Sequence, residues 1–344
     1  MLLLPVWVAW LFVSLPAFVI GDNNAVEVEI IETLDTSVYN VIQEVILEDQ
    51  ASTSSSTRGA AQADNKSSLN LPSKKLPSFE NGGVIFFLHV PKTGGTTIRR
   101  NVQNLDRIDY YFGRNYSTYW DTAPLVEDAI LHGTHNRSIL FFEIHAKDSP
   151  SLLRLRKRLK RWRDTAAHNK VSVFFFTVLR DSLPYALSHF NFFHVQKRNP
   201  TFEQCNATEE NFLRLSLSNP QCQFLAKGES SMRAQKIKDI VVQPETCEQV
   251  YDTIRESLDW VGTTERLSNE SLPLLSALLQ LPSNFTFSNH RITKKDAITT
   301  FRMQNLSSTA LDSVLLSTTI DTMLYERALR DFPFSRWDIP EQQQ

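Results

Sequence analysis

The chain has 344 residues, of which 42% are hydrophobic and 22% are charged, a composition that excludes collagen-like, fully disordered and polytopic membrane proteins. Its net charge of −2 is unevenly distributed: residues 1–57 carry eight acidic and no basic side chains, and residues 58–80 carry four basic and two acidic ones, so residues 81–344 sum to +4. This mild positive charge argues against a dedicated nucleic-acid-binding protein and is compatible with an anionic ligand.

The N-terminus predicts membrane targeting. Residues 2–20 contain no charged side chain, and a segment of this length is about long enough to span a bilayer. Residues 1–21 are therefore predicted to be a signal anchor or a signal peptide; Val19-Ile20-Gly21 is an acceptable cleavage site, but the basic region of a signal peptide is missing. Residues 22–80 are predicted to form an acidic stem and a flexible linker rich in Ser, Ala, Thr, Asn and Pro, ahead of a folded domain at 81–344.

The folded domain is predicted to be α/β with a central parallel sheet. Apolar runs at 84–90, 139–142, 171–179 and 260–262 are typical of strands buried on both faces. Amphipathic helical patterns separate these runs, for example at 98–105 and 152–162. In such sheets ligands bind at the carboxyl ends of the strands, where we expect the functional residues.

Glycosylation motifs and cysteines agree with a lumenal or extracellular chain. Seven asparagines open Asn-x-Ser/Thr sequons without an intervening proline: Asn65, Asn115, Asn136, Asn206, Asn269, Asn284 and Asn305. Three cysteines permit one disulfide and one remaining thiol, either Cys205–Cys222 or Cys222–Cys247. No Cys-x-x-Cys pair and no acidic metal cluster is present in the sequence, so no metal is predicted.

The first apolar run leads into a glycine-rich segment, Pro91-Lys92-Thr93-Gly94-Gly95-Thr96-Thr97, followed by a helical pattern. Glycines let backbone N–H groups approach an anion, the helix N-terminus is positive, and the lysine and threonines supply a charge and hydroxyl donors. The spacing is not that of a Walker A loop, since the lysine precedes the glycines, and this disfavours a kinase or ATPase. The alternative is a glycine-rich turn with an incidental lysine.

The run at 171–179 ends in Leu179-Arg180-Asp181, and Ser188 follows eight residues after Arg180. Asp181 or Ser182 can cap a helix that has Pro184 in its first turn. Arg180 and Ser188 could then reach one phosphate, although arginines at strand ends also commonly pair with carboxylates.

Together these segments resemble the Golgi carbohydrate sulfotransferases that use PAPS (3′-phosphoadenosine 5′-phosphosulfate), most closely the heparan sulfate and uronyl 2-O-sulfotransferase group. His89 to Thr97 is similar to that family's 5′-phosphosulfate loop, and Arg180 with Ser188 to its 3′-phosphate motif. Residues 260–267 and 288–295 resemble two further motifs of the family, in the same order. The resemblance implies a P-loop-like single domain in the Golgi lumen, attached to the membrane by the N-terminal segment or secreted if that segment is cleaved.

The resemblance also implies roles for individual residues. The expected PAPS-binding residues are Lys92, Thr93, Gly94, Gly95, Thr96, Thr97, Arg180, Ser188, Ser288, Arg291 and Thr293. The family's catalytic His-x-His corresponds here to Glu143-Ile144-His145, so that His145 matches the second histidine and glutamate replaces the first. His145 is the expected base, with Glu143 either orienting it or acting as the base itself, and Lys92 stabilises the leaving group.

The expected acceptor is a carbohydrate hydroxyl, on an anionic glycan or a proteoglycan, and related proteins imply a homo-oligomer. Residues 154–163 carry seven basic side chains on an amphipathic helical pattern, which is either a solvated helix face or a docking site for a polyanionic glycan. Two other functions stay open. One is a glycan-binding protein of the same fold without catalysis, which is favoured by the glutamate at position 143 in place of the family's histidine. The other is a protein-tyrosine sulfotransferase.

Overall fold

The computed structural model describes residues 73–112, 119–144, 150–196, 202–228, 242–282, 284–288 and 300–339, all within one compact unit, residues 70–344. The predicted targeting segment and the predicted stem and linker up to residue 72 lie outside the described residues. Among the residues that are described, no helix is both long and apolar enough to cross a membrane.

A five-stranded parallel sheet forms the centre of the fold. Its strands are β1 (Gly83–Leu88), β2 (Ile108–Phe112), β3 (Ile139–Ile144), β4 (Ser172–Leu179) and β5 (Trp260–Thr263), in the order β2-β3-β1-β4-β5. The predicted α/β architecture with a parallel sheet is therefore confirmed. The four apolar runs became β1, β3, β4 and β5, whereas β2 was not predicted, because this edge strand carries a mixture of polar and aromatic residues (Ile-Asp-Tyr-Tyr-Phe).

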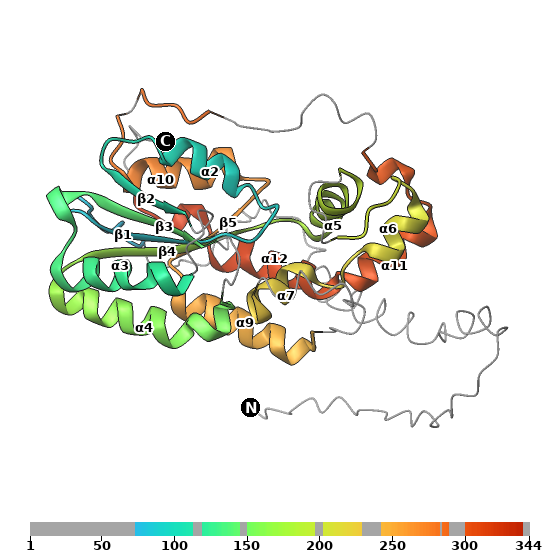
Figure 1. Ribbon diagram of the computed structural model, residues 1–344, viewed down its shortest axis with the longest axis horizontal. Coiled ribbons are helices and arrows are strands. Elements are labelled where there is room, and N and C mark those ends of the chain that lie inside the picture. The colour runs from blue at the N-terminus through green and yellow to red at the C-terminus, as the bar shows by residue number, and fades with distance from the viewer. Residues whose placement is uncertain are drawn as a thin grey trace, which may run out of the picture. The chain divides into compact units, whose positions relative to one another are not determined.

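Helices cover both faces of the sheet (Figure 1). One face is covered by α3 (Tyr119–His132), α4 (Leu152–Asn169) and α9 (Pro244–Ser257), and the other by α2 (Gly95–Val102) and α10 (Leu272–Leu278). Beyond the end of β4 lies a second, smaller hydrophobic cluster built from α5 (Ser182–Phe190), α6 (Glu209–Leu215) and α11 (Ser308–Ser317). The described residues also form α7 (Pro220–Lys227) and α12 (Thr319–Asp331), with short helical segments η1 (His135–Arg137), η2 (Asn191–Val195), η4 (Leu267–Ser271), η5 (Met303–Asn305) and η6 (Phe334–Arg336).

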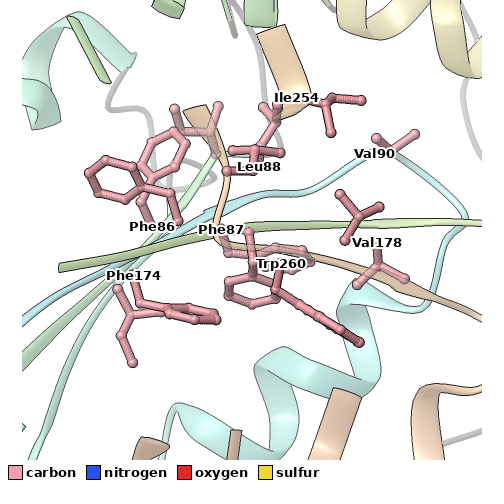
Figure 2. Close-up of a cluster of buried hydrophobic side chains, with 14 of the residues drawn as sticks. Phe86, Phe87, Leu88, Val90, Phe174, Val178, Ile254 and Trp260 are labelled. Carbon is pink, nitrogen blue, oxygen red and sulfur yellow. The ribbon is translucent and has the colours of Figure 1, made fainter. Parts of the chain in front are cut away.

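The core is rich in aromatic side chains, because the central strands place phenylalanines on both faces of the sheet. All six residues of β1 are buried. On one face Phe86 contacts Phe142, Phe175 and Trp162 of α4, each with ring centroids 5.8 Å apart. On the opposite face Phe87 stacks on Phe176 at 4.5 Å. Figure 2 shows this division around β1, with Phe86 and Leu88 on one side and Phe87 and Trp260 on the other.

The register of the strands brings their carboxyl ends to one edge of the sheet. Leu88 at the end of β1 is paired with Ile144 of β3 and with Thr177 of β4, and Leu179 at the end of β4 is paired with Thr263 of β5. The segments that follow β1, β4 and β5 therefore lie close together, at the edge of a parallel sheet where ligands commonly bind.

The disulfide joins Cys222 of α7 to Cys247 of α9, with Cα atoms 5.8 Å apart, and Cys205 is a free thiol. The structure thus decides between the two pairings that the sequence left open.

Candidate functional site

The loop between β1 and α2 has the shape expected of an anion-binding turn. Lys92 has a φ of 67° and Gly94 a φ of 96°, both left-handed, and the N–H groups of Thr97 and Ile98 donate to the carbonyl of Gly94 as α2 begins. A left-handed lysine is uncommon and costs conformational energy, which is characteristic of functional turns. The Thr93 hydroxyl donates to the carbonyl of Val90 at 2.7 Å and so fixes the loop from within.

Both glycines of the loop are required by their surroundings. A Cβ atom on Gly95 would lie 2.2 Å from two ring atoms of His89, which is itself buried. A Cβ atom on Gly94 would lie 3.0 Å from the Leu267 side chain, in addition to the unfavourable φ. The glycines therefore allow the start of α2, with its unpaired N–H groups, to pack directly over β1.

Lys92 points toward α5 and η2. Its Nζ atom lies 3.9 Å from the centre of the Phe192 ring, a cation–π contact at the edge of the loop. Nearby, burial and then the charges of His194 and Lys92 lower the pKa of His189 to about 3, so this histidine is neutral at physiological pH. Thr96 is half-buried and Thr97 is buried, both in the first turn of α2.

Arg180 contacts the loop between β1 and α2 directly. It follows the last residue of β4, and its Nη1 atom donates to the carbonyl of Lys92 at 3.3 Å. Its backbone is held on both sides by one side chain, since Arg180 N donates to Gln221 Oε1 at 2.8 Å and Gln221 Nε2 donates to Arg180 O at 2.7 Å. Within the described residues, Arg180 Nε is buried and has no hydrogen-bond partner. A largely buried guanidinium with an unused donor suits a bound anion.

The predicted cap of the following helix is confirmed. The Asp181 side chain accepts from the N–H of Leu183 at 3.3 Å, and Pro184 lies in the first turn of α5. Ser188 lies near the end of this helix and is half-buried. Burial lowers the pKa of Arg180, against the opposing charges of Glu265, Tyr185 and Asp181.

Two further predicted segments are hydrogen-bonded to the same loop and its helix. The Thr264 hydroxyl donates to the carbonyl of Thr93 at 2.9 Å and contacts that of Leu179 at 3.2 Å, so it joins the loop to the end of β4. Asn101 of α2 and Ser288 bind each other reciprocally: Asn101 Nδ2 donates to Ser288 O at 2.9 Å, and Ser288 N donates to Asn101 Oδ1 at 2.8 Å. Four segments that are far apart in the sequence are thus connected around α2 and its loop.

Glu143, the last residue but one of β3, is fully buried and has three polar partners. Its carboxylate accepts from Arg99 Nη2 at 2.6 Å and from Arg99 Nε at 3.1 Å, lies 2.6 Å from His89 Nδ1, and accepts from the Tyr110 hydroxyl. Burial alone would raise the pKa of Glu143, but the charge of His89 and the hydrogen bonds from His89 and Arg99 outweigh it and lower the pKa to about 2. A carboxylate this acidic is a poor proton acceptor at neutral pH.

Three of the expected site residues, His145, Arg291 and Thr293, lie outside the described residues. Conversely, sequence reasoning missed the residues that support the site: Arg99, Tyr110, Asn101 and Gln221. The position of Arg99 in the helix that follows the glycines was a weak indication that it lies near the site. Nothing local marks the other three, because their partners lie between 33 and 187 positions away.

The basic helix α4 is largely neutralised by neighbouring acids. Ion pairs join Arg156 to Glu256, Arg158 and Arg161 to Glu127, Lys160 to Asp164, and Arg163 to Asp259. These pairs favour a solvated helix face over a dedicated polyanion site.

The chain matches no protein-family model and has no significant match among curated proteins. In the described part of the chain, no group of three or more His, Cys, Asp or Glu residues is arranged to hold a metal ion.

Proposed function

We propose that this protein is a sulfotransferase of the P-loop-like fold that moves a sulfuryl group from PAPS to a carbohydrate hydroxyl. The observation that carries the proposal is the hydrogen bond from Arg180 to the Lys92 carbonyl, which joins the two segments that resemble the family's 5′- and 3′-phosphate motifs. Thr264 and Ser288, in the two other segments with this resemblance, are bound to the same loop and helix.

The residues present fit a nucleotide with two separate phosphate groups. The loop Lys92–Thr97 has the glycine geometry that lets backbone N–H groups approach the 5′-phosphosulfate, while Arg180 has an unused buried donor for the 3′-phosphate. In this assignment Thr96 and Thr97 supply hydroxyl donors to the 5′-phosphosulfate. The nucleotide site is completed by Ser188, Ser288, Arg291 and Thr293.

The reaction is an in-line displacement. The base removes the proton of the acceptor hydroxyl while the hydroxyl oxygen forms its bond to sulfur. The bond between sulfur and the oxygen of the 5′-phosphate breaks, and this phosphate gains negative charge that Lys92 stabilises. The products are a sulfate ester and 3′,5′-adenosine bisphosphate. His145 is the proposed base, and the low pKa of Glu143 argues for this division of roles.

By the same resemblance, we propose a location in the Golgi lumen with residues 1–21 as membrane anchor or cleaved signal, a glycan or proteoglycan chain as acceptor, and assembly into a homo-oligomer. The disulfide between Cys222 and Cys247 supports an oxidising compartment.

Binding of 3′,5′-adenosine bisphosphate to the full-length chain tests the cofactor site. Arg180→Ala should weaken binding about 10- to 100-fold, since a hydrogen bond to a charged group contributes about 1.5–3 kcal/mol. The matched control is Arg163→Ala, which removes an arginine paired with Asp259, away from the phosphate loop, and should leave the affinity unchanged. No binding by a folded wild-type protein would refute the proposed function.

A glycan-binding protein that has lost catalysis is the second candidate, favoured by the glutamate at position 143. Turnover of labelled PAPS with an acceptor separates the two. Lys92→Ala should abolish turnover without unfolding the protein if it is an enzyme; nucleotide binding without turnover in the wild type would favour the second candidate. A tyrosine-containing peptide in the same assay tests protein-tyrosine sulfation.

A further inference from the structure

Glu143 connects the two sides of the phosphate loop. His89 directly follows β1 and precedes the loop, whereas Arg99 lies in α2 and follows it. Both side chains bind the Glu143 carboxylate, His89 through Nδ1 at 2.6 Å and Arg99 through two nitrogens at 2.6 and 3.1 Å. The nine residues between them, 90–98, are thus held at both ends by a single side chain on the neighbouring strand β3.

The contacts of His89 extend this support to the turn itself. Its ring stacks on Phe87 with 5.2 Å between centroids, and it packs so tightly against Gly95 that no Cβ atom fits between them. Arg99, one helical turn beyond Gly95, fixes the rotation of α2 about its axis, because two parallel hydrogen bonds to a carboxylate define an orientation. A shift of Glu143 would therefore move both the ring beneath Gly95 and the start of α2, where the proposed anion would bind.

A third side chain also binds the Glu143 carboxylate. Tyr110 of β2 donates to the second carboxylate oxygen, Oε2, and burial together with the charge of Glu143 raises the pKa of Tyr110, which keeps its hydroxyl protonated. A fully buried carboxylate without partners would be strongly destabilising. Glu143 instead has partners from three different segments of the chain, so the fold holds its carboxylate in one defined position.

We propose that Glu143 is a positioning residue, which orders the phosphate loop and the start of α2 for the nucleotide through His89 and Arg99. In this proposal Glu143 takes no part in proton transfer. It preorganises the anion site, which is therefore formed before the ligand arrives. The identity of the ligand rests on the proposed function, whereas the ordering of residues 89–99 does not.

Glu143→Gln in the full-length chain tests the proposal, with Asp259→Asn as matched control. Asp259 is likewise a buried carboxylate paired with an arginine, through Arg163 at 3.0 Å, and it accepts from the backbone of β4. It lies directly before β5, an edge strand that β1 and β4 separate from β3. Both substitutions remove a buried charge, and only the first touches the loop.

Two measurements are made on each variant: amide hydrogen exchange of residues 89–99 and the affinity for 3′,5′-adenosine bisphosphate. Glu143→Gln should accelerate exchange in this segment and weaken binding about tenfold or more, in the range of supporting residues around a binding site. Asp259→Asn should lower the melting temperature without either effect. Unchanged exchange and affinity in Glu143→Gln, or equal effects in both variants, would overturn the proposal.

Arg99→Lys covers the case that Glu143→Gln does not fold. Lysine keeps the charge but loses the paired hydrogen bonds, so the start of α2 should exchange faster and nucleotide affinity should fall while the fold is kept. Wild-type affinity and exchange in Arg99→Lys would contradict the positioning role. If the wild-type protein binds no nucleotide, the proposed function fails, and the exchange measurement alone decides whether Glu143 orders the loop.

Discussion

The disulfide between Cys222 and Cys247 should stabilise the folded domain substantially. It closes a segment with a sequence separation of 25 residues, and the chain-entropy model gives ~3.5 kcal/mol for a loop of this length. With an unfolding entropy of ~2.1 cal/mol/K per residue for the unit of residues 70–344, this corresponds to a shift in melting temperature of ~6 °C. Reduction of the wild-type protein should therefore lower the melting temperature by about this amount.

Circular dichroism during heating measures the shift, and cysteine variants identify its origin. Cys222→Ala/Cys247→Ala should melt near the reduced wild type and should not respond to reductant, whereas Cys205→Ala should respond as the wild type does. A reductant response that disappears in Cys205→Ala would show that Cys205 is paired. A wild-type shift below about 2 °C would refute the entropic estimate.

The same disulfide lies close to the proposed 3′-phosphate site. Cys222 is preceded by Gln221, whose side chain holds the backbone of Arg180 on both sides. The first turn of α7 is also fixed by Asp321 of α12, which accepts from the N–H groups of Gln221 and Cys222, each at 2.8 Å. Loss of the disulfide would therefore loosen the helix that orients Arg180, so the reduced protein should also bind 3′,5′-adenosine bisphosphate more weakly.

Three further predictions concern the loop, its carboxylate and the surface. Gly95→Ala should destabilise the protein by about 1–3 kcal/mol or more in chemical denaturation, because the new Cβ atom overlaps the buried His89 ring. The control Gly133→Ala, where φ is 79° but no atom lies within 4 Å of the new Cβ, should cost only about 1 kcal/mol, and equal costs would contradict the packing argument. The pKa of Glu143 is about 2 in the folded protein and ordinarily 4.5, so its ionised form stabilises the fold above pH 4.5, and this stabilisation, on the order of 3 kcal/mol, is lost as the pH falls toward 2. The free energy of unfolding measured across this range should therefore depend less steeply on pH in Glu143→Gln than in the wild type. Expression in a secretory host should add N-glycans that a glycosidase removes, with Asn→Gln variants each losing one step in mass, and an unmodified chain would contradict the proposed lumenal location. The five sequon asparagines within the described residues are all exposed: Asn136, Asn206, Asn269, Asn284 and Asn305.

The strands could be predicted because their signal is local. A strand buried on both faces needs a continuous apolar run, and the phenylalanine-rich segments of β1, β3 and β4 are short runs of this kind. The edge strand β2 has one strand neighbour, and its Tyr110 and Asp109 serve polar partners, so no such run exists there. The position of the site at the carboxyl edge follows from the parallel sheet alone.

The support of the site could not be predicted in the same way. Gln221 is one polar residue among many in the sequence, and its role depends on α7 lying beside the end of β4, which only the folded chain determines. For Glu143 the sequence allowed two roles, base or orienting partner of His145. Its actual partners, His89 and Arg99, became visible only when β3 was placed beside β1.

The loop and Arg180, which are the two proposed phosphate-binding elements, are held in place by different parts of the fold. The loop is ordered by a buried charge within the sheet layer, through Glu143, whose hydrogen bonds are short and largely shielded from solvent. Arg180 is ordered from outside the sheet, by a helix that depends on a disulfide and on the buried Asp321. Reduction acts on the second support and substitution of Glu143 acts on the first. The two supports meet in the loop itself, because Arg180 donates to the carbonyl of Lys92 at 3.3 Å and the Thr264 hydroxyl contacts the carbonyls of both Thr93 and Leu179. The effects of reduction and of Glu143→Gln on nucleotide affinity should therefore not be additive, since each change also disturbs the segment that the other support holds.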